Sequence, residues 1–254
     1  MTGAVGLLDF LAGSGPQKAA VLADLDGCLI SGAQLLPHAL DLFDRCGDRL
    51  WIVSNNSSDT ADTLAARLAA MGFAMQAAQI VLAGEETIRR VAQERPGQRV
   101  AVHAAEPLCA LARQLGLITD HNAPDVAILA RDPGFCLASL TRLTAQVARG
   151  LPLIVTNPDL NHPDPEGHPV PETGALLAAL TAAVPGLAIP TVGKPRPDLL
   201  QLALARAGVA PADAVFIGDT PETDGAAARA AGVEFVLLRR PGTLSGTPPE
   251  AQPC

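Results

Sequence analysis

Two acidic residues separated by one leucine follow an apolar run near the start of the chain. The run 21–23 ends at Asp24, and Asp26 and Gly27 come directly after it. Two carboxylates this close repel each other, and a shared proton or a divalent cation relieves the repulsion. Alone, the pattern also fits an ordinary turn in which Gly27 adopts a positive φ. The pattern of two acids predicts a catalytic site only in combination with other elements.

A hydroxyl and two amides end a second apolar run. Residues 51–53 are followed by Ser54, Asn55 and Asn56, just ahead of a segment with helical periodicity. A hydroxyl and backbone N–H groups at the start of a helix bind an anion without carrying net charge. The alternative is that Ser54 to Ser58 only turns the chain and caps the helix.

Lys194 is one of only two lysines in the chain, the other being Lys18, and it follows Gly193 on a short loop. A lysine supplies a compact point charge, where an arginine would supply a planar fork. We therefore expect Lys194 to contact an anion, although a solvent-facing lysine is the simpler alternative.

A third apolar run, 215–217, ends at Gly218 and Asp219, and Asp224 follows where a helix is expected to begin. If this run is a strand, Asp219 is placed to complete a set of oxygen ligands for Mg²⁺ with Asp24. The alternatives are that Asp219 forms a turn and that Asp224 is an acidic residue favoured at a helix N-terminus.

Short β-rich runs alternate with longer Ala- and Leu-rich segments of helical period. The expected strands are 20–23, 50–53, 100–103, 126–129, 153–155, 214–217 and 234–238. Expected helices include 59–71, capped by Ser58 and ended by Gly72, and 198–207. This alternation predicts a mostly parallel sheet covered by helices, in which ligands bind at the carboxyl ends of the strands. The four elements should therefore meet at one edge.

Together the four elements resemble the motifs of the haloacid dehalogenase (HAD) superfamily. Within it, the chain resembles subfamily IIA, the NagD-like or para-nitrophenylphosphatase-like hydrolases, whose second motif commonly reads Ser/Thr-Asn-Asn and whose cap carries Thr-Asn-Pro-Asp. The matching sequences here are Asp24-x-Asp26, Ser54-Asn55-Asn56, Thr156-Asn157-Pro158-Asp159, Lys194 and Gly218-Asp219 with Asp224.

The resemblance implies an α/β fold with a Rossmann-like parallel-sheet core and an inserted α/β cap domain. The stretch between Asn56 and Gly193 is far longer than a connection between strands needs, which independently favours an insertion. We expect a discontinuous core of residues 1–83 and 189–254 and a cap of residues 84–188. The segment 157–172, rich in Pro, Asp, Glu and His, should be an ordered surface loop.

The resemblance also implies residue roles. Asp24 would be the nucleophile that forms an aspartyl-phosphate, and Asp26 the general acid. Mg²⁺ would be held by Asp24, by the backbone carbonyl of Asp26 and by Asp219. Asp224 would orient Lys194 or a water at the cation. Phosphate or substrate contacts would come from Ser54, Asn55, Asn56, Asn157 and Lys194, the last also counted as catalytic.

The predicted activity is Mg²⁺-dependent hydrolysis of small phosphorylated metabolites. The alternatives are a phosphotransferase of the same chemistry and a catalytically idle phosphate-binding or receiver-like signalling protein. An idle protein would be expected to lose one of the charged residues of the motifs, and none is lost. A receiver is about half this length and lacks a cap-sized insertion.

The composition narrows the classes of partner that the protein is expected to bind. A net charge of -8 and a pI near 5.0, with one Trp and no Tyr, disfavour nucleic acid. A start without a basic segment and the absence of a long unbroken apolar run disfavour a membrane and predict a cytoplasmic protein. The resemblance allows a homodimer through the cap. Cys28, beside the reacting loop, is either a packing residue or a site of inhibitory oxidation.

Overall fold

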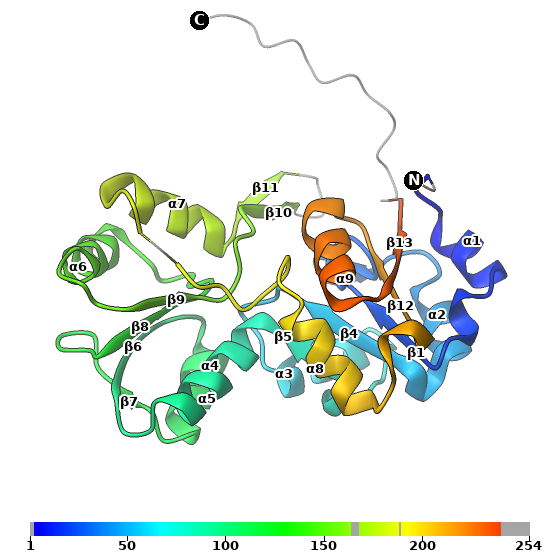
Figure 1. The fold of residues 1–254 in the computed structure, drawn as a ribbon, viewed down its shortest axis with the longest axis horizontal. Coiled ribbons are helices and arrows are strands. Elements are labelled where there is room, and N and C mark those ends of the chain that lie inside the picture. The colour runs from blue at the N-terminus through cyan, green and yellow to red at the C-terminus, as the bar shows by residue number, and fades with distance from the viewer. Residues whose placement is uncertain (1–2, 164–167, 188, 240–254) are drawn as a thin grey trace, which may run out of the picture.

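The computed structural model describes residues 3–163, 168–187 and 189–239. Within them the chain forms two larger sheets, one of five strands and one of four, and every strand pairing in both is parallel. Figure 1 shows each sheet in its own half of the molecule with helices around it. The α/β class with parallel sheets that the sequence predicts is thus confirmed.

The strands of the first sheet, in spatial order, are β13 (Glu234–Leu237), β12 (Ala214–Gly218), β1 (Ala20–Ala23), β4 (Leu50–Ser54) and β5 (Ile80–Leu82). Those of the second sheet are β7 (Ile118–Thr119), β6 (Arg99–His103), β8 (Val126–Leu129) and β9 (Leu153–Val155). Two hairpins pair β2 (Ile30–Ser31) with β3 (Gln34–Leu35) and β10 (Asn161–Pro163) with β11 (Pro169–Pro171).

The helices are α1 (Leu7–Ala12), α2 (Ala39–Cys46), α3 (Ala61–Ala70), α4 (Ala83–Glu94), α5 (Glu106–Gln114), α6 (Leu137–Ala148), α7 (Thr173–Ala183), α8 (Asp198–Ala207) and α9 (Ala226–Ala231). Over the described ranges, none of them combines the length and the apolar character that crossing a lipid bilayer requires.

Strand β1 is central to the first sheet because its side chains are apolar on both faces. Val21 and Ala23 pack in one core with α2 and α3, whereas Ala20 and Leu22 pack in another with α8 and α9. All four residues are fully buried. A continuous apolar run of this kind is typical of a parallel strand covered by helices on both sides.

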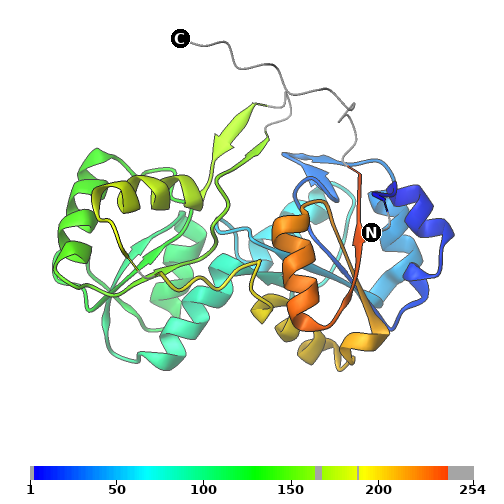
Figure 2. The same ribbon diagram turned by 45° about the horizontal axis from the view of Figure 1, so that its top comes forward.

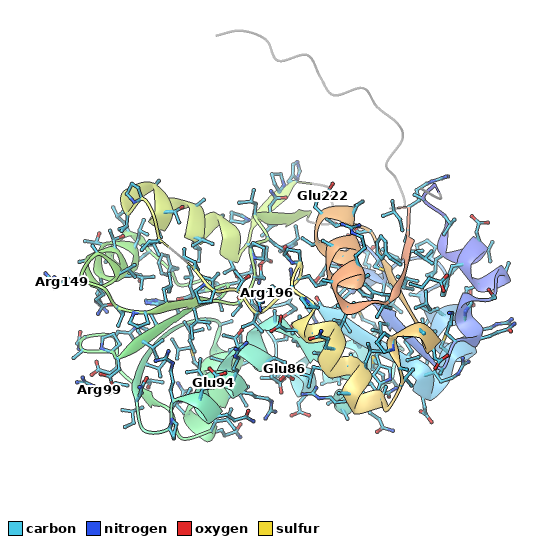
Figure 3. All side chains as sticks on the ribbon, in the orientation of Figure 1. Glu86, Glu94, Arg99, Arg149, Arg196 and Glu222 are labelled. Atoms are coloured by element: carbon cyan, nitrogen blue, oxygen red, sulfur yellow. The ribbon has the colours of Figure 1, made fainter. Side chains whose placement is uncertain are left out.

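The second sheet repeats this arrangement, with α4 and α5 on one face and α6 and α7 on the other. Figure 2 shows the molecule with its top rotated toward the viewer. In this view α7 runs beside the β10–β11 hairpin, which reaches toward the first half. Arg99 and Arg149 extend from the outer side of the second half (Figure 3).

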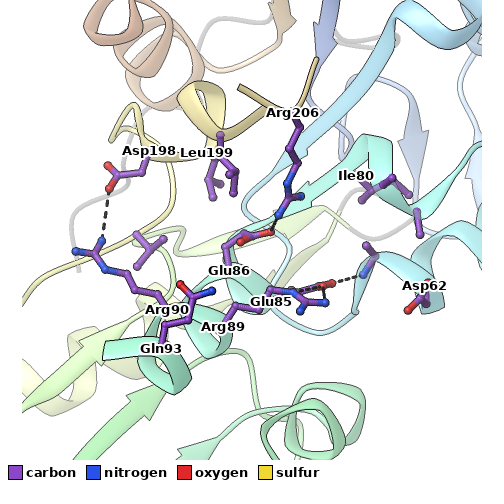
Figure 4. Close-up of a pocket in the computed structure, with 15 residues that line it drawn as sticks. Asp62, Ile80, Glu85, Glu86, Arg89, Arg90, Gln93, Asp198, Leu199 and Arg206 are labelled. Atoms are coloured by element: carbon purple, nitrogen blue, oxygen red, sulfur yellow. Dashed lines mark hydrogen bonds and ion pairs between the residues drawn. The ribbon is translucent and has the colours of Figure 1, made fainter. Parts of the chain in front are cut away.

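Helix α4 contacts both halves. Ile88 and Val91 lie in the core of the second sheet. On its other side, Glu85 accepts a hydrogen bond from the first turn of α3, and Glu86 forms an ion pair with Arg206 of α8 (Figure 4). A groove of about 720 Å³ lies between α4, α3 and α8. The helix therefore connects the two sheets as one continuous element.

Several expected elements differ in detail from the structure. All seven expected strands form, but β5, the edge strand β7 and the short hairpins were not predicted. Helix α3 begins at Ala61 and is capped by Thr60, whose side chain accepts from the Thr63 N–H. The expected Ser58 cap is wrong because Ser58 lies two residues before the cap position, and its Oγ accepts from Arg131. The expected loop 157–172 contains the β10–β11 hairpin, and its residues 164–167 lie outside the described ranges.

Candidate active site

Three strand ends of the first sheet bring predicted site residues to one edge. Strand β1 pairs in parallel with β12 on one side and with β4 on the other. The N–H of Asp24 donates to the Ile217 carbonyl at 2.9 Å, which extends the pairing by one residue. Because parallel strands end at the same edge, Asp24, Ser54 and Asp219 all line one cavity there.

Lys194 places its ammonium between two carboxylates at this edge. Its Nζ lies 2.6 Å from Asp24 Oδ1 and 2.7 Å from Asp224 Oδ1. All three side chains are buried, Lys194 at 2% exposure. The ammonium also lies 5.4 Å from the ring centroid of Phe216. Buried charges persist only when they are paired, so these three side chains hold one another in place.

A single π-helical turn, Pro221–Gly225, directs Asp224 toward Lys194. Asp224 Oδ2 accepts a hydrogen bond from the Thr220 N–H at 3.1 Å. A Cβ on Gly218 would lie 2.5 Å from that oxygen, so only glycine lets the carboxylate lie against the strand end. Such π turns are frequent at functional sites. Two roles were expected for Asp224, to orient Lys194 or to orient a water at the cation. The first role requires this contact with Lys194.

The charges in this group shift one another's pKa values. Burial raises the pKa of Asp24, Lys194 opposes that effect, and Asp224 and Asp219 add to it. Burial disfavours the ammonium of Lys194 too, but Asp224 and Asp24 outweigh it, so the pKa of Lys194 is raised. Lys194 therefore stays charged at physiological pH. A bound cation would act on Asp24 in the same direction as Lys194.

The carboxylates at this edge suit a hard divalent cation. Asp24, Asp219 and Asp224 each place one oxygen within 4.8 Å of the others. Three carboxylates carry more negative charge than one ammonium balances, and oxygen ligands are those that Mg²⁺ and Ca²⁺ prefer. The donor set therefore fits the expected Mg²⁺. The Asp26 side chain is not part of this group, and the sequence-based expectation assigned only its backbone carbonyl to the cation.

Asn55 connects Lys194 to the second half of the molecule. Its Oδ1 accepts from the Lys194 N–H at 2.7 Å, and its Nδ2 donates to the Lys194 carbonyl at 3.0 Å. The same Nδ2 lies 3.1 Å and 3.2 Å from the two carboxylate oxygens of Asp159, the last residue of the Thr-Asn-Pro-Asp sequence. The side chain of Asn55 thus fixes the loop that carries the ammonium.

The structure places the other two predicted amides differently. Asn56 lines the cavity, but its Oδ1 accepts from the Ser58 and Asp59 N–H groups and so turns the chain. Asn157 is 1% exposed and lies outside the cavity lining. Its Nδ2 donates to the Asn55 carbonyl at 2.9 Å and to Ser57 Oγ at 3.2 Å. Asn157 therefore connects the two halves through hydrogen bonds. It does not line the cavity in which the predicted substrate contact would lie.

Asp26 lies at the same cavity, on the loop after β1. Gly27 follows with φ 77°, which makes glycine favourable at this sharp exit. Burial raises the pKa of Asp26, and His162 and Arg67 are the charged neighbours that oppose the rise most. A carboxyl group with a raised pKa is suited to carry a proton that it can donate.

The cavity has a volume of about 510 Å³ and receives residues from both halves. No site role was assigned from the sequence to those that come from α3 and from the second half: Arg67, Arg131, Asp159, His162 and Glu172. Arg131 comes two residues after β8, so a strand-end rule applied to the second sheet would have found it. His162 lies within β10 and Glu172 directly follows β11, and the sequence did not predict this hairpin.

Cys28 packs behind the site. It is 4% exposed and belongs to the core that contains α2 and α3. Burial, together with Asp24 and Asp219, raises its pKa well above the usual thiol value. A buried thiol with a raised pKa reacts slowly, which favours the packing role over oxidation.

Comparisons with known proteins agree with this geometry. A family model described as haloacid dehalogenase-like hydrolase matches residues 21–118, and a HAD-hydrolase-like model matches 191–248. Dihydroxyacetone phosphatase of Corynebacterium glutamicum is 30% identical over 222 residues, which are 86% of this chain and 80% of that protein.

Two solved structures extend the comparison. NagD from Escherichia coli K-12 matches with a TM-score of 0.76 and 26% identity, over 87% of both chains. A glycerol phosphate phosphatase from Mycobacterium tuberculosis in complex with magnesium matches with a TM-score of 0.79 and 27% identity, over 89% of this chain and 69% of that one. The latter protein has also been solved in complex with calcium.

A parallel sheet carries aspartates and a lysine at its carboxyl edge and faces a second α/β unit across a cavity. This is the arrangement of an α/β hydrolase built from two units. The chain belongs to the haloacid dehalogenase-like hydrolase family, in its NagD-like branch (subfamily IIA) of phosphoric monoester hydrolases.

Proposed function

We propose that the protein hydrolyses small phosphorylated metabolites by transferring their phosphoryl group first to Asp24 and then to water, with Mg²⁺ as cofactor. One observation carries the proposal: Asp24 lies buried against Lys194, with Asp219 and Asp224 within 4.8 Å, at the edge where a parallel sheet binds ligands. A carboxylate nucleophile that attacks an anionic ester needs positive charge beside it, which Lys194 and a cation bound by the surrounding carboxylates would supply together.

In the first step an oxygen of Asp24 bonds to phosphorus as the bond to the ester oxygen breaks, and Asp26 gives its proton to the departing alkoxide. In the second step water attacks phosphorus, Asp26 takes up the water's proton, and Asp24 leaves as a carboxylate. Lys194, Ser54 and the N–H of Asn55 would hold the phosphoryl oxygens. Asp224 keeps the ammonium oriented.

A Mg²⁺ ion held by Asp24, Asp219 and the Asp26 carbonyl would offset the negative charge of the ester and the nucleophile. The carboxylate donor set supports this proposal, and the magnesium and calcium complexes of the M. tuberculosis relative agree with it.

We further infer that residues 1–83 and 189–254 act as the core and 84–188 as a cap that covers the site. The separate cores of the two sheets support this division. Closing such a cap excludes water and strengthens the charge interactions inside. We also propose that the protein forms a homodimer through the cap. Light scattering, which measures the mass of the protein in solution, would test this.

The test is phosphate release from phenyl phosphate by the purified protein. We expect release with Mg²⁺, its loss in EDTA and its return when Mg²⁺ is restored. Asp24→Asn should lower kcat by about 10³-fold or more, because the covalent route is lost. Turnover that is insensitive to EDTA would contradict the metal role. Consumption of the ester with phosphate appearing on an added alcohol would instead identify a phosphotransferase.

A further inference from the structure

Three residues from the second half form a connected cluster on the wall of the active-site cavity. Glu172 Oε1 lies 2.7 Å from His162 Nδ1 and 3.3 Å from Arg131 Nε. A carboxylate can only accept, so the imidazole donates through Nδ1 and its Nε2 remains to meet a ligand. Arg131 also donates to Ser58 Oγ at 3.4 Å. None of the three has a role in the phosphoryl transfer proposed above.

The cluster lies on the side of the cavity where the alcohol part of the ester must lie. The phosphoryl group is assigned to Asp24 and Lys194, deep at the strand ends. His162 lines the same cavity as Asp26, the proposed proton donor, and reaches it from the β10–β11 hairpin, which extends toward the first half. Because Asp26 serves the ester oxygen, a group beside it faces the leaving alcohol.

Both arginines on this side are already paired with carboxylates. Arg131 pairs with Glu172, and Arg67 pairs with Asp59 at 3.0 Å. Asp159 adds a further carboxylate to the lining. A second anionic group on the substrate would have to approach three carboxylates to reach two paired arginines. A neutral hydroxyl, which both donates and accepts, fits alternating donors and acceptors without displacing either pair.

The lining also lacks a stacking surface. Among the described residues that line this cavity there is no Phe, Trp or Tyr, and Leu160 is the largest apolar side chain. Flat aromatic groups are usually held between aromatic side chains, and among these lining residues His162 alone carries an aromatic ring. The wall therefore favours hydrogen-bonding groups over ring faces.

We propose that Arg131, His162 and Glu172 form the leaving-group subsite, and that it selects esters of small uncharged polyhydroxylated alcohols over those whose alcohol carries a carboxylate, a second phosphate or a flat aromatic ring. The proposal rests on the function proposed above and defines its substrate class.

A substrate panel tests the selection with the wild-type protein and Mg²⁺. The panel contains glycerol 3-phosphate, a hexose 6-phosphate, phosphoglycolate, a sugar bisphosphate and pyridoxal 5'-phosphate, with phenyl phosphate as reference. We expect kcat/KM for at least one of the first two to exceed that of the next three by about tenfold or more, the effect of one charged hydrogen bond. Preference for a carboxylated, bisphosphorylated or pyridoxal ester overturns the inference while leaving the phosphatase function intact.

Two variants test the residues themselves. Arg131→Gln should lower the ratio of kcat/KM for the preferred polyol ester to that for phenyl phosphate by about tenfold, mainly through KM. Arg149→Gln, on the outer side of the second half, is the matched control and should leave the ratio unchanged.

Glu172→Gln should raise the relative activity toward esters whose alcohol carries an anionic group. Without the carboxylate, the positive charge of Arg131 is uncompensated, so the relative kcat/KM for phosphoglycolate should rise about tenfold. An unchanged ratio in both Arg131→Gln and Glu172→Gln would show that the cluster does not contact the leaving group. Absence of phosphate release from every ester would overturn the inference together with the proposed function.

Discussion

At the scale of single residues, two carboxyl groups separated by one leucine have different surroundings. Asp24 contacts the buried ammonium of Lys194, whereas Asp26 has no such contact and faces the part of the cavity that His162 and Arg67 line. Enzymes commonly assign different roles to two acids by giving them different environments. Burial raises the pKa of both carboxyl groups. At Asp24 the ammonium of Lys194 opposes that rise and a bound cation would oppose it further, which favours the anion there, whereas Asp26 lacks this contact and is suited to hold a proton.

Replacing Asp26 should reveal this role through the leaving group. In Asp26→Asn, kcat/KM, which reports the first step, should fall by about 10²-fold or more with glycerol 3-phosphate and by clearly less with 4-nitrophenyl phosphate, since the aryl oxide leaves without a proton. The comparison requires only steady-state rates for both esters. Equal losses with the two esters would argue against proton donation by Asp26.

At the scale of elements, the site depends on a loop held between two strand ends. The Gly193 N–H donates to the Thr156 carbonyl at 2.8 Å, and the next residue, Lys194, is bound by Asn55 through both of its backbone groups. A Cβ on Gly193 would lie 2.8 Å from the Thr156 oxygen and closer still to Asn55 Oδ1. The loop therefore has no room for a side chain before Lys194.

Gly193→Ala should displace the ammonium without removing it. We expect kcat to fall about tenfold or more and the free energy of unfolding to fall by about 1–3 kcal/mol, as for other forced side chains. Gly3→Ala is the control, because nothing lies within 4 Å of its added Cβ. Wild-type kinetics in Gly193→Ala would show that the position of Lys194 is not critical.

The sequence predicted the residues at the first sheet's edge because parallel strands end together. Asp24, Ser54 and Asp219 could be placed there from apolar runs and their last residues alone. The positions of His162 and Glu172 could not be predicted, since they depend on how the second sheet packs against the first. Asn157 matched a family sequence, but its burial between the halves depends on partners distant in the chain.

At the scale of the whole molecule, the two halves contribute different ends of one cavity and have separate cores. The second half contains a buried histidine, His103, which is 4% exposed and packs edge-on against His121 and Phe135 at centroid distances of 4.9 and 5.3 Å. Burial, with His121 and Arg142 nearby, lowers the pKa of His103 from 6.5 to about 4. The folded protein therefore disfavours protonation of this ring.

His103 should make stability depend on pH. Between about pH 6.5 and pH 4 the unfolded chain binds a proton at this position that the folded chain does not, so stability is lost as pH falls. From pH 7 to pH 5 the contribution is about 2 kcal/mol. Urea unfolding of the wild type and His103→Asn at both pH values measures it. The same loss in both proteins would contradict the assignment.

The most direct measurement of the central claim is the mass of the peptide that contains Asp24 after acid quenching during turnover with Mg²⁺ and phenyl phosphate. The account predicts that this peptide carries one added phosphoryl group in the wild type and none in Asp24→Asn. Continued release of phosphate with Asp24 unmodified at every quench time, or with the phosphoryl group on another residue, would contradict it.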